Sequence, residues 1–397
     1  MAQLLQLGIR FPGNRASPSG DVRFASPAVR PPFQSPCMSS SRAPCIPLRD
    51  CSSIAIFRAL QLGDLLCAVP ALRALRRASP QARITLVGLP WARAFALRFC
   101  DYVDDFVAFP GAPPLPEQTP DVARLPAFFA DMQARGFDLG IQMHGNGVHT
   151  NGIVARFGAK RLAGFHTADG PVSESRCFLP YPAHLHEIRR NLRLVEFLGA
   201  PPQGEALAFP LTQRDRDELG SIVGLPRLVP GSYACLHPGA RNPAKRWPVE
   251  RFARLGDALH ASGFDIVLTG SAGERPIADA VARAMRAPSH NVASPISIGA
   301  MAALLADARL LVTNDTGVSH VAVGLGLPSV VVFFATDPRQ WAPLDARLHR
   351  TVYRPGDVDV TTVLRAALEL LDDTGGRAPA RVLAAPVGAR ASAHRNV

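Results

Sequence analysis

The stretch ARLLVTNDTGVSHVAVGLGLPSVVVFFA, residues 308–335, indicates the fold of the second half of the chain. Residues 308–313 form an apolar run of strand length, and the polar segment NDTG follows directly. Residues 318–325 have the pattern of a helix, and residues 329–334 form a second apolar run that is rich in Val and Phe. A strand, a turn, a helix and a second strand in this order predict a parallel sheet with a right-handed crossover.

The turn at Asp315, Thr316 and Gly317 is a candidate anion site. The first N–H groups of a helix are free and lie at the positive end of its dipole, so this position accepts a phosphate readily. His320 lies about one helical turn further along the chain. A plainer interpretation is that Asp315 only caps the helix and that His320 only packs. These residues alone leave both interpretations open.

Length and composition predict a globular protein with two domains. The chain has 397 residues, and 47% of them are hydrophobic, which is enough for two cores. Apolar runs are interrupted well before about 18 residues, so we expect no transmembrane helix. No continuous apolar segment follows a basic start at the N-terminus, so we expect no secretory signal and a cytoplasmic protein. The seven cysteines are scattered, which indicates neither a disulfide framework nor a zinc site.

The formal net charge of +11 favours anionic partners, and arginine supplies nearly all of it. Nucleotide phosphates, acidic lipid headgroups and nucleic acids would all suit such a surface. Nucleic acid is the least favoured of the three, because no block of Lys and Arg with interleaved aromatic residues occurs.

Strand and helix patterns alternate along most of the chain, which is typical of a doubly wound α/β sheet. We expect one Rossmann-like domain over residues 51–215 and a second over residues 225–374, with residues 212–220 in the passage between them. Residues 1–50 are rich in Pro, Ser and Arg and predict a disordered extension, and residues 375–397 predict a loose tail. Two such domains that face one another leave a cleft, and ligands bind there at the C-terminal ends of the strands.

Two loops carry residues that suit group transfer. Gly63 and Asp64 follow the first strand and open a helix, so Asp64 is either a general base in the cleft or only a capping carboxylate. The loop HPGARNPAKRWP, residues 237–248, combines small residues with Lys245 and Arg246. Such a loop suits stabilisation of a pyrophosphate leaving group without a metal. Trp247 in this loop is expected to be a buried anchor.

Further candidates follow other strands. Glu274 ends the loop TGSAGE and either accepts hydrogen bonds from sugar hydroxyls or is only a favourable charge in the first turn of a helix. His184 and His186 show no spacing that indicates a metal site. Candidates for the acceptor side of the cleft are His144, Asn146 and His149.

Taken together, these residues resemble glycosyltransferase family 9, the bacterial heptosyltransferases of lipopolysaccharide core synthesis. The resemblance covers roughly residues 53–371. It rests on Gly63-Asp64-x-x-x-x-x-Pro70-Ala71-Leu72, Lys245-Arg246-Trp247-Pro248 and Asp315-Thr316-Gly317-x-x-His320. It implies the GT-B fold, with two facing Rossmann-like domains, the acceptor mainly on the first and the nucleotide-sugar on the second.

The resemblance also implies an inverting reaction without a metal or other cofactor. A sugar, in this family heptose from ADP-heptose, would move to an anionic glycolipid or core oligosaccharide, with peripheral contact to the inner membrane. Asp64 would deprotonate the acceptor hydroxyl, Lys245 would hold the donor phosphates, and Asp315 would contact the donor sugar.

Other implied roles concern the nucleotide. Thr316, Gly317 and the helix start would bind pyrophosphate, and His320 would support them. Glu274 would bind the ribose, and Ile296 would line the adenine pocket. The loop HPGARN has no Ser or Thr where family members often present hydroxyls to phosphate, so the sequence leaves the donor open.

Two other functions fit the same fold. A sugar-nucleotide epimerase or hydrolase would process a nucleotide-sugar without an acceptor. A non-catalytic nucleotide-sugar-binding protein would not need the base Asp64 in the opposite domain.

Overall fold

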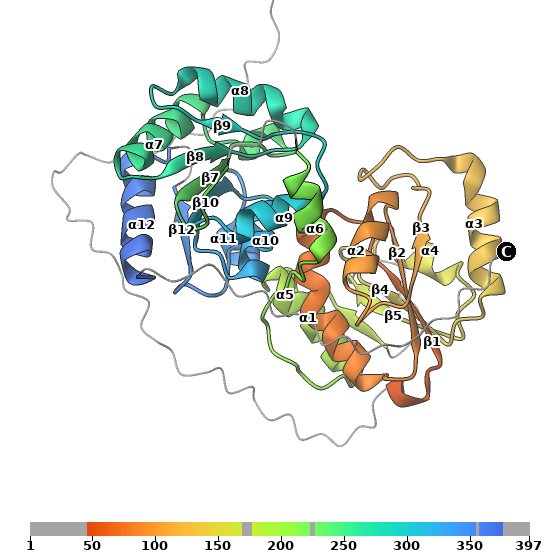
Figure 1. Ribbon diagram of the computed structural model, residues 1–397. Helices are drawn as coiled ribbons and strands as arrows, with labels where there is room; N and C mark the ends of the chain where they lie inside the picture. The colour runs from red at the N-terminus through yellow and green to blue at the C-terminus, as the bar shows by residue number, and fades with distance from the viewer. Residues whose placement is uncertain (1–45, 169–176, 223–226, 355–356, 376–397) are drawn as a thin grey trace, which may run out of the picture. The chain divides into compact units, whose positions relative to one another are not determined.

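The computed structural model describes residues 46–168, 177–222, 227–354 and 357–375. These residues form two lobes, each built on a six-stranded sheet whose strand pairs are all parallel (Figure 1). This architecture confirms the predicted α/β class with two Rossmann-like domains. None of the helices in the described ranges has the length and apolar composition that are needed to cross a bilayer.

The first lobe has the strand order β3-β2-β1-β4-β5-β6. Its strands are β1 (Ser53–Phe57), β2 (Arg83–Gly88), β3 (Asp105–Ala108), β4 (Leu139–Gln142), β5 (Arg161–His166) and β6 (Phe178–Pro180). Its helices are α1 (Leu62–Ala78), α2 (Arg93–Arg98), α3 (Leu125–Ala134), α4 (Asn151–Ala155) and α5 (Glu187–Phe197). Short 3-10 helices cover Leu48–Asp50, Pro90–Ala92 and Val122–Arg124.

The second lobe has the strand order β12-β11-β10-β7-β8-β9. Its strands are β7 (Tyr233–His237), β8 (Asp265–Leu268), β9 (His290–Asn291), β10 (Leu310–Asn314), β11 (Ser329–Phe333) and β12 (His349–Tyr353). Its helices are α6 (Gln213–Gly220), α7 (Val249–Ala261), α8 (Arg275–Ala284), α9 (Ile298–Ala306), α10 (Gly317–Leu325), α11 (Pro338–Trp341) and α12 (Val360–Asp373). Two 3-10 helices cover Pro243–Lys245 and Ala272–Glu274.

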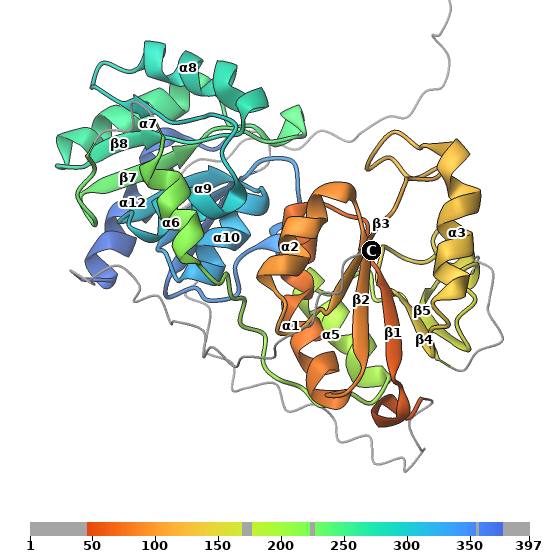
Figure 2. The ribbon, with the colours of Figure 1, turned by 45° about the vertical axis from the view of Figure 1, so that its right-hand side comes forward.

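Helices cover both faces of each sheet. Successive side chains of β1 point to opposite faces, so Ile54 and Ile56 pack with α1 and α5, while Ala55 and Phe57 pack with α3 and α4. Figure 2 shows α3 on one side of the first sheet and α1, α2 and α5 on the other. The second sheet is covered by α9 and α10 on one face and by α7 and α12 on the other.

Residues 212–220, interpreted from the sequence as part of the passage between domains, contain helix α6, which contacts both lobes. Thr212 caps this helix and accepts a hydrogen bond from Asp215 N, and α6 packs on α9 of the second lobe. The Asp215 carboxylate pairs with Arg98 of the first lobe, with Nη1 to Oδ2 at 2.7 Å. The predicted domain boundary at residue 215 therefore falls inside a helix. The segment QRDRDELG carries no apolar stripe, which is why its sequence does not show a helix.

The disordered extension predicted for residues 1–50 is too long at its C-terminal end. Ile46 is fully buried and Leu48 is 5% exposed, and both belong to the core that β1 and α1 share. The remainder of the predicted extension and residues 376–397 of the predicted tail lie outside the described residues.

The two lobes share a continuous apolar cluster that runs from α1 and α5 to α9 and α10. Gly324 of α10 lies at a close contact in this joint, because its carbonyl accepts a hydrogen bond from Phe209 N at 3.2 Å. A Cβ at Gly324 would lie 2.9 Å from both Ala208 C and Phe209 N. These are backbone atoms, so they cannot move aside as a flexible side chain would.

We expect Gly324→Ala to lower the free energy of unfolding by about 1–3 kcal/mol, the usual cost of overpacking. Urea unfolding measures the change. Gly152→Ala is the matched control, because a Cβ at Gly152 in α4 meets nothing within 4 Å. An equal effect of both substitutions would contradict the close contact at the joint.

Candidate functional site

A cavity of about 810 Å³ lies between the start of α1 in the first lobe and the loops of the second lobe. We call it the interlobe cavity. The second-lobe part of its wall comes from segments that follow β7, β8, β9, β10 and β11, as expected for the C-terminal ends of parallel strands. The residues that the resemblance assigns to catalysis and donor binding all line it, namely Asp64, Lys245, Glu274, Ile296, Asp315, Thr316, Gly317 and His320.

Asp64 both caps α1 and faces the cavity, so the two interpretations of this residue are compatible. It is the third residue of the helix, and its Oδ2 accepts a hydrogen bond from Gln61 N at 3.2 Å. Burial raises the pKa of the Asp64 carboxyl, and the nearby Glu187 raises it further, whereas Arg58 opposes both effects. A carboxylate with a raised pKa is a stronger base toward a bound hydroxyl.

Arg58 holds the first turn of α1 in place through the Asp64 carbonyl. The sequence alone assigns no role to Arg58. Its Nε and Nη2 donate to the Asp64 carbonyl at 3.0 and 2.7 Å, and its side chain is 2% exposed. The same guanidinium pairs with Glu187 at 2.8 Å and donates to Asn191 Oδ1 at 3.1 Å. A charged residue directly after an apolar strand was the available signal, but its partners lie on α5, far away in the sequence.

Lys245 and Asp315 form an ion pair at the opposite wall, with Nζ 2.7 Å from Oδ2. Thr336 also donates to Oδ2, at 2.6 Å. The interpretation of Asp315 as only a helix cap is wrong, because Thr316 occupies the N-cap position of α10 and no side chain makes a cap hydrogen bond there. Asp315 instead holds Lys245, while the first turn of α10 faces the cavity at Gly317.

Asn314 connects the loops around this wall. Its Oδ1 accepts from Trp247 N at 2.9 Å, and its Nδ2 donates to the carbonyls of Pro238 and Gly239. Trp247 is 1% exposed and its Nε1 donates to Val358 O at 2.7 Å, so it is the buried anchor that the sequence predicted. The loop after β7 is therefore held against the end of β10, which places Lys245 beside α10.

Glu274 both caps and lines the cavity. Its Oε2 accepts from Ser271 N and Oγ at 2.9 and 2.8 Å. A Cβ at Gly239 would overlap the Glu274 carboxylate, so a larger residue at that position would displace this carboxylate. The neighbouring end of the cavity is apolar, and its side chains are Ile296, Ile298 and Met301. Helix α6 supports this end, because Glu218 accepts from Ser297 N and Oγ, both at 2.7 Å.

His320 is a packed and neutral residue of the wall. Burial lowers its pKa to about 4, although Asp315 acts in the opposite direction. Its Nδ1 lies 3.7 Å from Cys67 Sγ in α1, and a Cβ at Gly63 would lie 3.0 Å from its Cδ2. His320 therefore brings no positive charge to a phosphate at neutral pH.

The candidates for the acceptor side are not part of the interlobe cavity wall. His144 is 6% exposed, stacks on Phe57 at 5.3 Å, and has Nε2 3.4 Å from Glu117 Oε1. Burial, together with Arg58, lowers the pKa of His144 to about 3. Asn146 and His149 are exposed.

Comparisons with known proteins show the family of the chain. Residues 126–354 match the family described as glycosyltransferase family 9 (heptosyltransferase). A lipooligosaccharide heptosyltransferase 2 of Haemophilus influenzae is 32% identical over 112 residues, which cover 27% of this chain and 32% of the relative. A lipopolysaccharide heptosyltransferase 2 of Escherichia coli K12 is 34% identical over 122 residues, which cover 29% of this chain and 35% of the relative. The matched segments thus span about a third of these curated relatives.

Solved structures show the same fold. A family 9 glycosyltransferase from Veillonella parvula has a TM-score of 0.69 and 21% identity, covering 83% of this chain and all of that chain. The ADP-heptose lipopolysaccharide heptosyltransferase II of Escherichia coli has a TM-score of 0.65 and 19% identity, covering 80% of this chain and 98% of that chain.

The neutral, buried histidines predict a loss of stability in acid. The pKa values of His144 and His320 are lowered to about 3 and 4, so both bind protons more readily in the unfolded chain. Their contribution is complete above about pH 6.5 and falls as the pH drops toward 4, by about 1.4 kcal/mol per pH unit for each proton. Urea unfolding at a series of pH values measures this slope.

The variant His144→Phe keeps a ring on Phe57 and removes one titrating group, so we expect a shallower slope. Identical slopes in the two proteins would contradict the burial of a neutral His144.

Proposed function

Because the chain belongs to glycosyltransferase family 9, we propose that it moves a sugar from a nucleotide-sugar donor to an acceptor hydroxyl. The donor we propose is ADP-heptose, and the acceptor is a lipopolysaccharide core or a related glycolipid. The observation that carries the proposal is the interlobe cavity, where Asp64 lies on one wall and Lys245 with the start of α10 lies on the other. Transfer needs a base and leaving-group stabilisation on opposite sides of the reacting carbon.

Asp64 is the proposed general base. It takes the proton of the acceptor hydroxyl while that oxygen bonds to the anomeric carbon, and the bond from this carbon to the diphosphate oxygen breaks. A single displacement from the opposite face inverts the anomeric configuration. Arg58 holds the carbonyl of Asp64 and so fixes the turn that carries the base.

Lys245 and the first turn of α10 are proposed to receive the diphosphate. Lys245 supplies a positive charge that Asp315 holds in place, and the helix start supplies N–H groups that no side chain caps. Gly317 lets the diphosphate approach the backbone closely. These groups stabilise the leaving charge, so the proposed reaction needs neither a metal ion nor a cofactor.

The nucleoside would occupy the other end of the cavity. Glu274 has its Oε2 bonded to Ser271, and its second oxygen is proposed to accept hydrogen bonds from the ribose hydroxyls. Ile296 and its apolar neighbours would contact the base. Asp315 is proposed to contact the donor sugar, so that the anomeric carbon would lie between Asp64 and the start of α10.

The acceptor is proposed to approach from the first lobe. The net charge of +11 suits an anionic glycolipid at the cytoplasmic face of the inner membrane, with peripheral contact to that surface and no nucleic-acid partner. The names of the curated relatives support a heptose donor, since each is a heptosyltransferase of lipopolysaccharide or lipooligosaccharide.

We expect Asp64→Asn to reduce kcat by about 10²–10⁴-fold, because the amide cannot take the acceptor proton. The amide oxygen still accepts the Gln61 N–H, so α1 and nucleotide binding should persist. Single-turnover assays with ADP-heptose measure the rate, and the thermal shift caused by ADP measures binding.

Normal turnover in Asp64→Asn would remove this residue from the mechanism. Thermal shifts with UDP and GDP serve as the control for the donor. A preference for either nucleotide would be compatible with a glycosyltransferase but would contradict ADP-heptose as the donor. Release of heptose by the wild type without any acceptor would favour the hydrolase.

We expect Lys245→Met to lower kcat by about 10²–10³-fold, because the charge opposite the leaving group is lost. The sequence has only two lysines, so Lys160→Met is a natural control. Lys160 is exposed and pairs with Asp138 at 2.8 Å, away from the cavity wall. Addition of EDTA should leave the wild-type rate unchanged, and a rate that EDTA abolishes would contradict the metal-free mechanism.

A further inference from the structure

A second cavity of about 390 Å³ lies behind one wall of the interlobe cavity. His320 lines both cavities, Trp341 lines the first, and Ala342, the next residue in the chain, lines the second. The wall between the two cavities therefore consists of His320 and the end of α11.

Trp341 faces the end of the interlobe cavity that holds Asp64. Its ring contacts the His320 ring edge to face, with centroids 6.4 Å apart and planes at 61°. His320 in turn packs on Gly63, the residue before Asp64. Trp341 is thus linked through His320 to Gly63, which directly precedes the carboxylate that would take the acceptor proton.

His186 of the first lobe holds this part of the second lobe. It is 6% exposed and caps α5, since its Nδ1 accepts the Ile188 N–H at 3.2 Å. Because Nδ1 accepts, the ring proton is on Nε2, which donates to the Ala342 carbonyl at 2.8 Å. The imidazole is therefore a neutral bridge between the start of α5 and the end of α11.

Helix α11 needs such a support. It has only four residues, and its own anchor at the C-terminal end is the hydrogen bond from Ala342 N to Pro338 O at 2.8 Å. The hydrogen bond from His186 holds the carbonyl of the same residue, Ala342, which directly follows Trp341. The Glu187 carboxylate does not compete for the imidazole, because it is engaged by Arg58 at 2.8 Å.

We infer that Trp341 is the wall against which the transferred sugar lies, and that His186 is the positioning residue that sets Trp341 from the opposite lobe. An indole offers a rigid apolar face with little loss of conformational freedom, which suits the C–H face of a sugar ring. The sugar-facing role rests on the proposed function, whereas the link from His186 to Trp341 does not.

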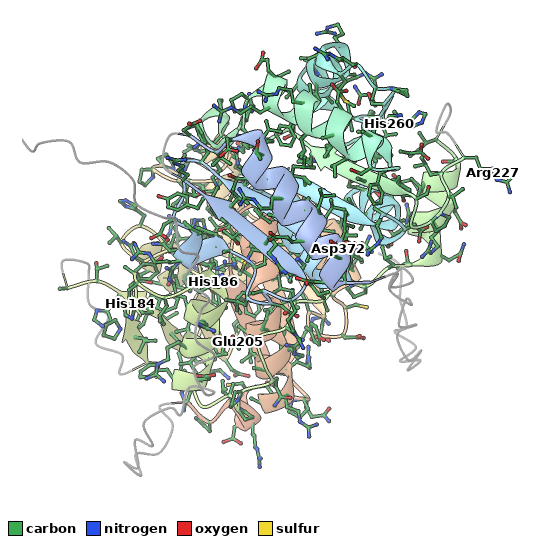
Figure 3. All side chains as sticks on the ribbon, turned by 90° about the vertical axis from the view of Figure 1, so that its left-hand side faces the viewer. His184, His186, Glu205, Arg227, His260 and Asp372 are labelled. Carbon is green, nitrogen blue, oxygen red and sulfur yellow. The ribbon has the colours of Figure 1, made fainter. Side chains whose placement is uncertain are left out.

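The variant His186→Asn separates the two hydrogen bonds of the imidazole. Asparagine is a good N-cap and can still accept the Ile188 N–H, but it is too short to reach the Ala342 carbonyl. His184→Asn makes the same change at an exposed neighbour and is the matched control; both histidines are labelled in Figure 3.

The first readout needs no ligand. The chain has three tryptophans, so 5-fluorotryptophan labelling gives three ¹⁹F resonances, and Trp341→Phe identifies the one of interest. His186→Asn should shift or broaden the Trp341 resonance and leave Trp91 and Trp247 unchanged, while His184→Asn should move none. A Trp341 resonance that stays in place in His186→Asn overturns the positioning role.

The second readout compares two ligands. His186→Asn should weaken ADP-heptose binding by about threefold to tenfold, the worth of one hydrogen bond, with the Kd of ADP unchanged. Trp341→Ala should show the same selectivity for the sugar. Equal weakening of ADP and ADP-heptose overturns the sugar-facing role. A wild type that binds ADP but no ADP-heptose overturns the proposed donor, and the ligand-free resonance still decides the link from His186 to Trp341.

Discussion

The first turns of α1 and α10 approach one another so closely that a side chain at Gly317 would make tight contacts with α1. A Cβ at Gly317 would lie 3.1 Å from Leu62 Cβ and 3.2 Å from Gly63 N. This contact joins the two lobes at the point where each presents its chemistry. Asp64 follows Gly63 in one helix, and the uncapped N–H groups of α10 begin at Gly317 in the other. A bulkier residue at either position would push the two helix starts apart, and with them the proposed base and the proposed leaving-group site.

A helix N-terminus lies on each of the two walls of the cavity, and the two N-termini differ in how they are capped. In α1 the third residue of the helix is Asp64, whose carboxylate reaches back to Gln61 N and satisfies the helix from within. In α10 no side chain caps the first turn, because Asp315 is held by Lys245 and Thr336 instead. One helix start thus carries an anion of its own, and the other is free to receive one. This asymmetry supports the proposal that the base lies in the first lobe and that the second lobe receives the diphosphate.

The sequence predicts the parts of the site that depend on local order. Residues that directly follow parallel strands must meet at one edge of a sheet, which is why Asp64, Lys245, Glu274 and the turn at Asp315 were found without a structure. The supports of these residues come from distant segments. Arg58 depends on α5, and Trp341 depends on a bridge from His186, and no local pattern encodes either pairing. Helix α6 was not predicted from the sequence for another reason. Its stability comes from capping and packing rather than from an apolar stripe.

The overall charge explains less of donor recognition than its size suggests. Three carboxylates and two cations line the interlobe cavity, while His237 and His320 are kept neutral by burial, which lowers the pKa of both. The cavity is therefore not basic, although the chain carries a formal charge of +11. Recognition of a diphosphate must then come from where Lys245 and the start of α10 lie, and not from a general positive field. Much of the excess of arginine lies in residues 1–45 and 376–397, outside the described residues, so the net charge characterises the whole chain and not this cavity.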